Sequence, residues 1–531
     1  MKNKCYSIPY EINNLCELFD KSTKKFGYSN CIEQFVDGKI KKYTFFDLKN
    51  DVFKLSRYFK KHNLANSYIL ISGELSYTWL VAFFSIILVS SKAVCVDKNF
   101  LDRNNLPDLL QGIDLSCVIS NQVFDNIDSL SFKKIESILK NDSFDFDFCL
   151  STKVKDPANE IAVVLFTSGT TGNEKQVYLT HMNIAKDIMG SQMMFGGKDY
   201  DRLLSFLPVH HAFELTVGIL TPFYVGAAVC VPRELKYAMQ DIKTYSPSLM
   251  PVVPLILKTI KKNIEMTIKK QKKERLFKLM LKFRAFPIIG NLFQVFLHNK
   301  IVSSLGGNLK TFICGGATVS SELQVFFKKL GFRIFYGYGI TECSPVVCCS
   351  SDSPLGSVGI SIPFCEVCSI NEELCVRGSI VARQLGSNIN EHMEFYDDWY
   401  RTGDLGYVDK KGNVFITGRK KELIILDNGE NVSPTQLEAI LGKLDGVEEV
   451  LVYASTVSNR TSGLAAIIKP NKVCDMQADT ELINNYYMQI NALKLPNKFK
   501  IEKISIVRKN FSRTASGKVI RSKTIKLLEK G

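Results

Sequence analysis

Short apolar runs that stop at glycine, proline, histidine or hydroxyl residues recur along the chain, and they constrain the fold more than any other feature. The runs do not alternate apolar with polar residues, which is typical of parallel strands covered on both faces. Helix-like segments such as 14–26 and 45–61 separate the early runs. The expected strands are 68–71, 93–96, 117–119, 161–166, 203–206, 227–231, 309–313 and 332–335. Strands that alternate with helices predict an α/β fold in which parallel-rich sheets are layered with helices.

The length of 531 residues exceeds the size of one hydrophobic core, so more than one domain is expected. Beyond residue 420 the pattern changes to a small α+β unit, with strands expected at 447–453 and 464–468 and helices at 434–444 and 480–493. The sequence therefore predicts a large N-terminal domain, residues 1–419, and a small C-terminal domain, residues 420–531.

The stretch 165–180, LFTSGTTGNEKQVYLT, follows the expected strand 161–166. Its glycines allow positive φ angles that turn backbone N–H groups towards an anion, while its hydroxyls and lysine add donors and charge. The residues with these properties are Thr167, Ser168, Gly169, Thr170, Thr171, Gly172 and Lys175. The chain lacks GxxxxGK[ST], and no GxGxxG follows a strand, so those two nucleotide motifs are excluded. A phosphate-binding loop and a flexible surface turn both remain open for this stretch alone.

Several later strands end in clusters of residues that suit ligand binding. The clusters are Pro208, His210 and His211; Pro232 and Arg233; Gly315 and Gly316; and Gly337, Tyr338 and Gly339. In open parallel sheets, ligands bind outside the carboxyl ends of the strands. We therefore expect these loops and the stretch 165–180 to converge on one crevice. The two adjacent histidines and the isolated CxxC of Cys365 and Cys368 lack further ligands at metal spacing, which disfavours a metal at either place.

The start of the chain and its cysteines indicate a reducing compartment. No apolar signal segment occupies residues 1–14, and fifteen cysteines are spread throughout, so we expect free thiols in the cytoplasm. The uncharged run 75–91 lies between two expected strands. We interpret it as a buried helix rather than a membrane span.

The segment from Lys258 to Arg284 carries 11 Lys or Arg residues against two Glu, interleaved with apolar side chains. Three interpretations remain open: a solvated helical hairpin, a membrane-surface contact, and a docking site for an acidic carrier or partner. The formal net charge of +15 permits anionic partners. Nucleic acid is not expected as a partner, because no nucleic-acid-binding motif accompanies the charge.

Two further stretches contain polar residues at turns. Asp404 lies ahead of a hairpin expected to turn at 410–413, and Arg419 follows the second strand of that hairpin. Taken alone, they are a turn acid and a solvated base. Near the end, the stretch 513–521 reads RTASGKVIR and places a lysine in a Gly/Ser turn.

Five motifs agree in identity, order and spacing with the adenylate-forming (AMP-binding) superfamily. The stretch 165–180 resembles its phosphate loop, 335–342 its YGxTE motif, 400–404 its RTGD motif, 418–421 its hinge, and 516–518 its terminal catalytic lysine. The segment 205–214, SFLPVHHAFE, is similar to the LPLHHTFE pattern of bacterial long-chain fatty acyl-CoA synthetases. The resemblance covers the chain from about residue 15 to residue 521.

The resemblance implies an acid–thiol ligase with a mobile C-terminal domain. Such an enzyme activates a carboxylic acid, here a medium- to long-chain fatty acid, to an acyl-adenylate with ATP and Mg²⁺, releasing pyrophosphate. It then transfers the acyl group to the thiol of CoA and releases AMP. The implied catalytic residues are Lys518, Glu342, Thr341 and His211, with Glu342 as the Mg²⁺ ligand. The implied nucleotide-binding residues are the loop residues named above with Gly315, Gly316, Ala317, Tyr338, Gly339, Asp404 and Arg419. Lys421 takes the hinge position, and Gly429, Glu430 and Asn431 take the CoA side.

Alternatives to this function remain. The chain can be an acyl-carrier-protein ligase or a stand-alone adenylation enzyme that loads a carrier with a fatty, aryl or amino acid, or else a non-catalytic adenylate-binding homologue. A cytoplasmic enzyme that touches the inner membrane surface through the segment 258–284 would suit an apolar acid.

Three positions depart from the family pattern. Glu174 and Gln176 flank Lys175 where the family has Pro and Gly, and Glu372 replaces the Gly before Glu373. A carboxylate beside phosphates weakens the local positive potential. We therefore expect Glu174 and Gln176 to affect turnover and nucleotide affinity rather than the class of reaction.

Overall fold

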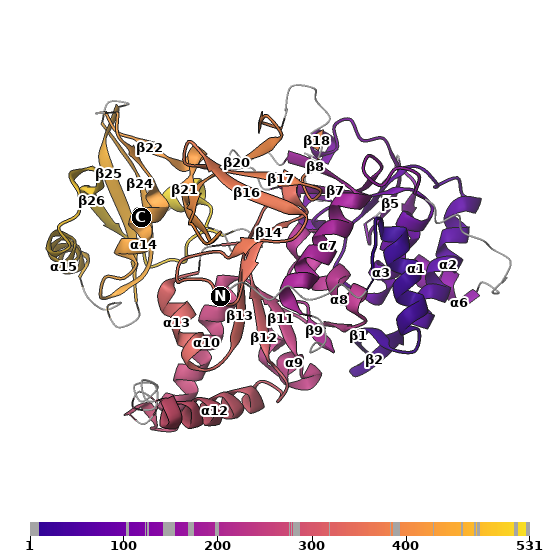
Figure 1. Ribbon diagram of the computed structural model, residues 1–531, viewed down its shortest axis with the longest axis horizontal. Helices are drawn as coiled ribbons and strands as arrows, with labels where there is room; N and C mark the ends of the chain where they lie inside the picture. Colours follow the sequence, from indigo (N-terminus) through magenta and orange to yellow (C-terminus); the bar gives the residue numbers. More distant parts are fainter. Residues whose placement is uncertain are drawn as a thin grey trace. The chain divides into compact units, whose positions relative to one another are not determined.

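The computed structural model has two compact units, Met1–Val367 with Val376–Tyr400, and Cys368–Cys375 with Arg401–Gly531 (Figure 1). The residues that it describes are 10–101, 106–122, 124, 127–141, 154–167, 175–196, 201–275, 277, 279, 287–317, 319–382, 384–385, 393–427, 429–457, 460–471, 474, 478–513 and 519–526. Sheets alternate with helices in the first unit, and the second is a smaller α+β unit. The predicted fold class is confirmed.

A seven-stranded sheet in the first unit contains the strands on both sides of the predicted phosphate loop. Its order is β18 (Gln384–Leu385), β8 (Lys175–Thr180), β7 (Ile161–Thr167), β4 (Lys92–Cys95), β3 (Tyr68–Ile71), β5 (Leu115–Ile119) and β6 (Ser129–Leu130). The strand expected at 161–166 is confirmed as β7, and it runs parallel to β4. Its other neighbour β8 is antiparallel. The expectation of a purely parallel setting is wrong on that side, because a hairpin rather than a crossover helix follows β7.

A nine-stranded sheet forms the second layer of the first unit. Its order is β15 (Ile360–Ser361), β14 (Val346–Ser350), β13 (Arg333–Gly339), β12 (Thr311–Cys314), β11 (Leu249–Val252), β9 (Arg202–Leu204), β10 (Ala228–Val231), β1 (Asn30–Val36) and β2 (Lys39–Thr44). The strands from β13 to β1 are parallel neighbours, so their carboxyl ends share one edge. β11 is not among the expected strands, because it is a short run that contains Pro251.

A helical layer lies between the two sheets (Figure 1). α7 (His181–Phe195) contacts β7, β8 and β14, while η2 (Glu214–Leu220), a π-helical stretch, contacts β11 and continues into α8 (Thr221–Val225), which contacts β10. α7 begins at a capping box formed by Thr180 and Asn183. Both sheets therefore share one set of helices.

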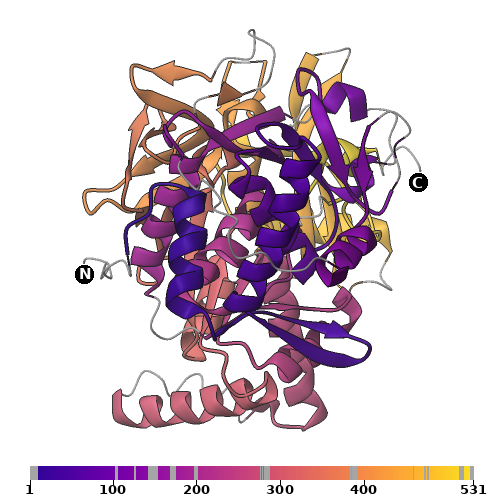
Figure 2. The same ribbon diagram turned by 90° about the vertical axis from the view of Figure 1, so that its right-hand side faces the viewer.

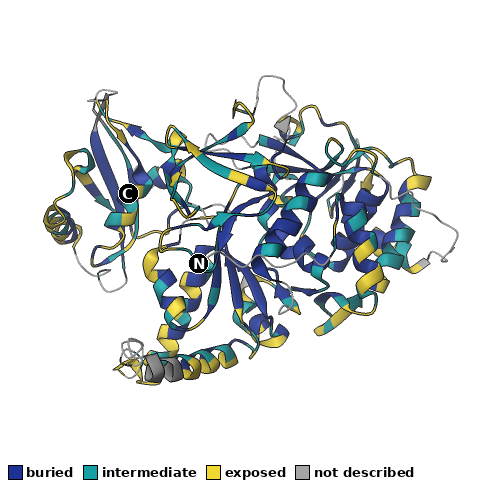
Figure 3. Ribbon diagram, in the orientation of Figure 1, coloured by how far each residue is buried: buried dark blue, intermediate teal, exposed yellow. Residues whose placement is uncertain are grey.

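The expected early helices are confirmed and pack into the same apolar core (Figure 3). They are α1 (Leu15–Phe26), α2 (Phe45–Lys61) and α3 (Tyr77–Leu88). Every residue of α3 is buried, which confirms a buried helix at 75–91. Among the described residues, no helix has the length and apolar character needed to cross a membrane.

Further helices cover the outer face of the nine-stranded sheet (Figure 2). They are α9 (Ala238–Tyr245), α10 (Pro254–Lys270), α12 (Pro287–Ser304) and α13 (Ser321–Lys329). α10 and α12 extend beyond the sheet, and α10 begins the basic segment. The short elements of this unit are α4 (Lys98–Leu101), α5 (Leu106–Leu109), α6 (Phe132–Asn141), η3 (Leu235–Tyr237) and η4 (Thr341–Cys343).

The second unit has its own apolar core. A three-stranded sheet of β24 (Val447–Val457), β25 (Arg460–Pro470) and β26 (Ile501–Ile506) packs with α14 (Pro434–Leu441) and α15 (Asp479–Ala492). The strands and helices expected there are confirmed, and β26 is additional. The remaining helices are η5 (Lys420–Glu422), η6 (Asn497–Phe499) and α16 (Arg521–Ile525).

Two smaller sheets complete the fold. Five strands form one of them: β16 (Cys365–Ile370), β17 (Glu373–Gly378), β20 (Trp399–Val408), β19 (Phe395–Tyr396) and β21 (Val414–Arg419). The boundary between the two units runs through this sheet. β22 (Ile424–Ile425) pairs with β23 (Asn431–Val432).

Candidate functional site

The carboxyl edge of the nine-stranded sheet brings together the strand-end clusters of the first unit. β9, β10, β12 and β13 belong to one run of parallel strands, so the histidines, Pro232 with Arg233, the glycines and Tyr338 all leave the sheet at the same edge. This confirms the expected convergence for this sheet. The edge is where a ligand of an open parallel sheet binds.

His210 connects this edge to the seven-stranded sheet. Its Nε2 lies 3.6 Å from a carboxylate oxygen of Asp97, which follows β4. Burial and the neighbouring His211 lower the pKa of His210 to about 4, although Asp97 acts in the opposite direction. The imidazole is therefore neutral at pH 7. The carboxyl edges of both sheets meet at this contact.

His211 and Glu214 place unpartnered polar atoms inside the same unit. Burial lowers the pKa of His211, and its Nε2 is buried with no hydrogen-bond partner among the described residues. Glu214 is fully buried at the start of η2; one carboxyl oxygen contacts the Ser205 hydroxyl, and the other has no described partner. Burial raises the pKa of Glu214 to about 8, so the side chain is mostly a neutral carboxylic acid at pH 7. Buried polar atoms without partners call for a ligand or a water.

The backbone after β12, at Gly315, Gly316 and Ala317, has little side-chain bulk around it; we refer to these three residues as the shelf. A Cβ on Gly315 would lie 3.2 Å from the Phe213 ring, so a larger residue there would press against the segment that carries the histidines. Gly316 has φ +83°, which a side chain would strain, and Gly316 and Ala317 are exposed. The absence of bulk leaves the backbone open to a flat group.

The residues Tyr338 to Glu342 form the end of β13 and the turn η4. Tyr338 is buried, whereas Thr341 and Glu342 are half-buried. η4 packs against β7 and β8, which places Thr341 and Glu342 beside the hairpin of the predicted phosphate loop. A Cβ on Gly339 would collide with the carbonyl of Pro345, so this tight turn requires glycine.

A buried network that the sequence analysis did not find holds this turn. Asp187 of α7 accepts a hydrogen bond from the N–H of Val346 at 2.8 Å, and the Thr216 hydroxyl of η2 donates to the carbonyl of Ser344 at 3.0 Å. The carbonyl of Glu342 accepts from the N–H of Ala382 at 2.8 Å. Burial raises the pKa of Asp187. The sequence gives no clear signal for this role, because Asp187 is one of several polar residues on α7 and an aspartate is more often found at the surface.

The two ends of the predicted phosphate loop lie opposite one another. Thr167, the last residue of β7, pairs with Lys175, the first residue of β8. The other loop residues, Ser168, Gly169, Thr170, Thr171 and Gly172, and also Glu174, lie outside the described residues.

Gln176 differs from the expectation that it belongs to the loop. It is the second residue of β8 and is buried, and its Nε2 donates to the carbonyls of Leu109 at 2.8 Å and Gln111 at 3.0 Å. Its Oε1 accepts from the Tyr178 hydroxyl at 2.7 Å. The Gln176 side chain therefore binds the end of α5, Gln111 and Tyr178, and its effect on turnover and nucleotide affinity stays a prediction.

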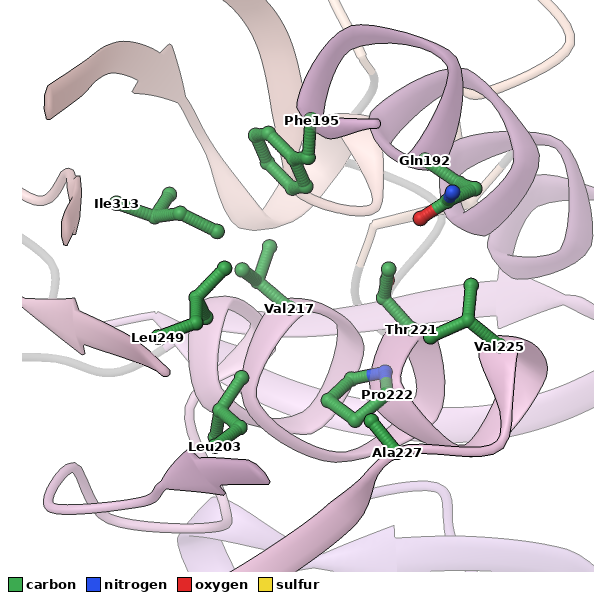
Figure 4. Close-up of a pocket in the computed structure, with 10 residues that line it drawn as sticks. All are labelled: Gln192, Phe195, Leu203, Val217, Thr221, Pro222, Val225, Ala227, Leu249 and Ile313. Carbon is green, nitrogen blue, oxygen red and sulfur yellow. The ribbon is translucent and has the colours of Figure 1, made fainter. Parts of the chain in front are cut away.

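A pocket lies behind the edge, between the helical layer and the nine-stranded sheet (Figure 4). Its cavity volume is small, about 20 Å³, which is room for roughly one water molecule. Apart from one amide and one hydroxyl its lining is apolar: Gln192, Phe195, Leu203, Val217, Thr221, Pro222, Val225, Ala227, Leu249 and Ile313. Such a pocket suits an apolar group.

In the second unit, Asp404 and Arg419 are brought together. They pair across β20 and β21, and Arg419 Nε lies 2.8 Å from a carboxylate oxygen of Asp404, which is almost fully buried. Thr402 fixes the turn before Asp404, since its hydroxyl donates to the carbonyl of Leu374 at 2.7 Å and accepts from the N–H of Asp404 at 3.1 Å. The turn therefore holds the Asp404 carboxylate at a fixed position.

Glu373 binds several residues of the same region, a role that no motif in the sequence indicates. Its carboxylate accepts from Arg401 at 2.7 Å, from Lys420 at 3.3 Å and from the N–H of Gly403 at 3.1 Å. Burial opposes ionisation, but the hydrogen bonds from Arg401 and Lys420 outweigh it and lower the pKa of Glu373. The RTGD turn and the start of η5 are therefore tied to β17 through one carboxylate.

Lys421, the predicted hinge residue, is exposed between two anchored neighbours. Lys420 contacts Glu373, and Glu422 lies 3.3 Å from Nε of Arg521. Gly429, Glu430 and Asn431 are exposed at and after the turn between β22 and β23. Lys518 lies outside the described residues, which resume at the bridge between Arg513 and Val519.

The described residues contain no group of three or more His, Cys, Asp or Glu side chains that can hold a metal ion. Cys365 is buried, with its sulfur 3.5 Å from the carbonyls of Val347 and Ile362. The cysteines that the structure describes, Cys368 among them, form no disulfide with one another.

Comparisons with known proteins cover both units. The AMP-binding enzyme family matches residues 20–385, and the AMP-binding enzyme C-terminal domain matches residues 421–531. Long-chain-fatty-acid–CoA ligase FadD15 of Mycobacterium bovis is 30% identical over 300 residues, which are 52% of this chain and 49% of the relative. Long-chain-fatty-acid–CoA ligase 1 of Homo sapiens is 30% identical over 347 residues, 60% of this chain and 49% of the relative. The chain spans about half the length of the curated relatives it matches.

Solved structures share the fold at low sequence identity. The o-succinylbenzoate CoA synthetase MenE from Bacillus subtilis, in complex with the acyl-adenylate intermediate OSB-AMP, has a TM-score of 0.74 at 18% identity and covers 95% of this chain and 97% of its own. The anthranilate CoA ligase AuaEII, in complex with anthranoyl-AMP, has a TM-score of 0.76 at 17% identity and covers 100% and 99%.

Proposed function

The chain belongs to the AMP-binding enzyme family, and from this premise we propose that it joins a carboxylic acid to the thiol of CoA at the expense of ATP. A carboxylate oxygen of the acid attacks the α-phosphorus of ATP, which forms an acyl-adenylate and expels pyrophosphate. The thiol sulfur of CoA then attacks the acyl carbon, AMP leaves, and the thiol proton passes to solvent. One observation carries the proposal: the turn with Thr341 and Glu342 is held by a buried network beside the ends of β7 and β8.

The nucleotide side of the site is assigned from the first unit. Thr167, Lys175 and the loop between them hold the β- and γ-phosphates, where Lys175 supplies positive charge. Tyr338 packs against adenine beside the shelf of Gly315, Gly316 and Ala317. Glycine has no side chain, so the ring can approach this backbone closely. Thr341 donates its hydroxyl to the α-phosphate. Reactions of this kind are accelerated mainly by positioning and charge stabilisation, which a preorganised turn provides.

Glu342 fits a Mg²⁺ ion that accompanies ATP. Its half-buried carboxylate offers the hard oxygen ligand that Mg²⁺ prefers. The backbone of the turn is fixed, because the carbonyl of Glu342 accepts a hydrogen bond from Ala382. When bound, Mg²⁺ supplies neutralisation of phosphate charge. Glu342 itself holds one oxygen at a set place in the site.

The second unit supplies the remaining roles. Asp404, with Arg419 as its ion-pair partner, accepts hydrogen bonds from the ribose hydroxyls. Lys518 stabilises the charge that develops between the acid carboxylate and the α-phosphate. Lys421 is the pivot of a rotation between the two half-reactions, after which Gly429, Glu430 and Asn431 face CoA. The exposed position of Lys421 between two anchored neighbours supports the pivot.

We assign a medium- to long-chain fatty acid as the substrate. Support comes from the apolar pocket behind the edge and from curated relatives that are long-chain-fatty-acid–CoA ligases. We assign His211, whose Nε2 has no described partner, to the acyl side of the site, as the resemblance of the segment 205–214 implies. A carrier protein is the alternative acceptor; one structurally similar protein, McyG A-PCP, is complexed with phenylalanyl-adenylate.

Acid-dependent exchange between pyrophosphate and ATP tests the first half-reaction. Acids from acetate to palmitate are offered, and exchange is expected to peak at medium or long chains. Mass spectrometry with CoA and with a carrier protein, offered separately, identifies the acceptor. A lack of exchange with every acid would favour the non-catalytic alternative, and an adenylate that persists in the presence of CoA would refute CoA as the acceptor.

The role of Lys518 has a separate test. Lys518→Ala is expected to abolish pyrophosphate release while ATP binding, followed by fluorescence of a labelled nucleotide, stays nearly intact. Lys523→Ala, on the exposed side of α16, is the matched control. Unchanged pyrophosphate release in Lys518→Ala would refute the assignment.

We further propose that α10, α12 and the segment between them contact an anionic membrane from the cytoplasmic side. Exposed apolar side chains lie among the lysines of this region: Leu255, Met266, Leu279, Val295 and Phe296. A surface of this composition binds lipid through both apolar burial and charge. The free thiols agree with a reducing compartment.

Co-sedimentation with vesicles tests the membrane contact. Binding to vesicles rich in anionic lipid is expected at low salt, and it should weaken at high salt and in the double variant Lys269→Glu/Lys270→Glu. The control pair Lys443→Glu/Lys494→Glu changes charge equally in the second unit. No binding at low salt, or equal loss in both double variants, would remove the proposal.

A further inference from the structure

The pocket behind the sheet edge contains an amide that no described residue binds. Gln192 of α7 is 3% exposed, and its side chain makes no hydrogen bond to any residue that the structure describes. Its amide points into the pocket (Figure 4). An amide that borders a pocket without a protein partner takes its hydrogen bonds from water or from a ligand, a need that leucine or methionine at this position would not have.

Thr221 adds a second polar group near the amide. Its hydroxyl donates to the carbonyl of Thr216 at 2.8 Å, so the lone pairs of its oxygen are still available to accept. Figure 4 shows the two side chains on the same side of the pocket, with carbon-only side chains such as Leu203, Leu249 and Ile313 on the other. No charged residue lines the pocket among those described. The pocket is therefore apolar with one neutral polar corner.

The polar corner is separated from the sheet edge by the length of η2. Phe213 lies at the edge against Gly315, and the helical stretch η2 leads from there to Thr221. An α-helix of this length would span roughly 12 Å, and the wider π-helical winding of η2 makes the distance somewhat shorter. An acyl chain whose carboxyl is activated at the edge would reach the corner with its middle or its far end.

We propose that the acid taken by this protein carries a neutral hydrogen-bonding substituent, a hydroxyl or an oxo group, which Gln192 selects. The inference rests on the proposed acid activation and refines its substrate class. A hydroxyl donates to Gln192 Oε1 or accepts from Nε2, and it can also donate to the Thr221 hydroxyl oxygen. A carboxylate or an ammonium group at the same place would be buried without a counter-charge. A plain chain would leave the amide unpaired, which a site built for a hydroxyl penalises.

A comparison of kcat/KM between matched acids tests this selection. Decanoate is compared with its 8-, 9- and 10-hydroxy derivatives in the acid-dependent pyrophosphate release assay with the full chain. For the best hydroxy acid, kcat/KM is expected to be about tenfold above that for decanoate, in line with one buried hydrogen bond. In Gln192→Met, which keeps the length of the side chain, the ratio should fall to about one or below, because the plain chain gains while the hydroxy chain loses.

A second buried amide provides the control. Gln324 of α13 donates to the carbonyl of Val319 at 3.3 Å and lies outside the pocket, so Gln324→Met should leave the ratio of the two acids at the wild-type value. The thermal midpoint of each variant shows whether it folds. If Gln192→Met does not fold, the wild-type ratio decides alone. Equal kcat/KM for decanoate and all three hydroxy acids would overturn the inference and assign the amide to bound water. No turnover of any acid would overturn the proposed function instead.

Discussion

At the scale of single residues, several departures from common patterns have a physical reason in the fold. Glu372 follows Asn371 in the tight turn between β16 and β17, and both have positive φ, +64° and +51°. A two-residue hairpin turn with two positive φ angles favours Asn-Gly. Glu372, which stands where Gly is favoured, therefore strains the backbone of this turn. The carbonyl of Glu372 accepts a hydrogen bond from the N–H of Gly406 at 2.8 Å.

Glu372→Gly is expected to stabilise the protein by about 1 kcal/mol, because glycine adopts the left-handed conformation without a Cβ clash. Urea unfolding followed by circular dichroism measures the change. Glu372→Ala removes the carboxylate but keeps the Cβ, so it should bring no such gain. A gain of the same size in both variants would show that charge, and not conformation, is the cause.

Glu214 gives the stability a defined pH dependence. Burial raises its folded-state pKa from 4.5 to about 8. Between these values the folded protein binds more protons than the unfolded chain. The contribution of Glu214 to the unfolding free energy is therefore complete below pH 4.5 and decreases as the pH rises towards 8. Each unit of pKa difference corresponds to about 1.4 kcal/mol, which makes the full effect a few kcal/mol.

Glu214→Gln removes the titrating group and keeps the shape of the side chain. The difference in unfolding free energy between wild type and Glu214→Gln should shift in favour of the variant as the pH increases from about 5.5 to about 8.5. Equilibrium urea denaturation at four pH values measures it. A difference that does not vary with pH would mean that Glu214 keeps one protonation state throughout. All other titrating groups remain in both proteins, so their contributions cancel in the comparison.

At the scale of elements, strand ends could be predicted from the sequence, while the partners that hold them could not. Apolar runs that stop at glycine or proline mark β12 and β13, and the glycines after them reveal where a ligand approaches. Asp187 instead contacts Val346, 159 residues away, and Glu373 meets Lys420, 47 residues away. Contacts of this kind follow from how the layers pack, which periodicity along the chain does not encode. β11 escaped notice for a local reason, since Pro251 is unusual inside a sheet.

Arg521 joins four elements of the second unit and is the clearest case of such a contact. Its guanidinium donates to both carboxylate oxygens of Glu438 in α14 at 2.8 Å and to the carbonyl of Val452 in β24 at 3.0 Å, and it lies close to Glu422 of η5. Burial opposes the charge, but Glu438 and Glu422 outweigh it and raise the pKa of Arg521. Arg521, which follows Lys518 by three residues in the sequence, is thereby attached to η5 beside the predicted hinge.

Arg521→Met is expected to lower the unfolding free energy by about 3–5 kcal/mol, because it leaves two partly buried carboxylates without their cation. Arg521→Lys should recover only part of the loss, since lysine cannot form the two-pronged contact. Arg508→Met removes an exposed ion pair with Asp479 and should cost less than about 1 kcal/mol. Hydrogen exchange of peptides from α14 and η5 measures the local effect. Equal protection in Arg521→Met and wild type would exclude the attachment.

At the scale of the whole molecule, the proposed rotation predicts that one residue separates the two half-reactions. Lys421→Pro fixes φ near about −65° at the pivot. Thioester formation is expected to decrease at least about tenfold more than adenylation in this variant. Single-turnover assays of adenylate formation and of thioester formation from preformed adenylate measure the two steps. Lys421→Ala leaves φ free and shows how much of the loss belongs to the side chain. Equal loss in both steps would contradict a pivot at this residue.

The helical layer of α7, η2 and α8 is shared by both sheets of the first unit, and this has a consequence for how that unit comes apart. Neither sheet can lose its partner helices without exposing the inner face of the other. Heat should therefore melt both sheets in one cooperative step, with equal calorimetric and van't Hoff enthalpies for the first unit. A ligand bound against these helices would raise that single transition temperature for the whole unit, since it binds only the folded form.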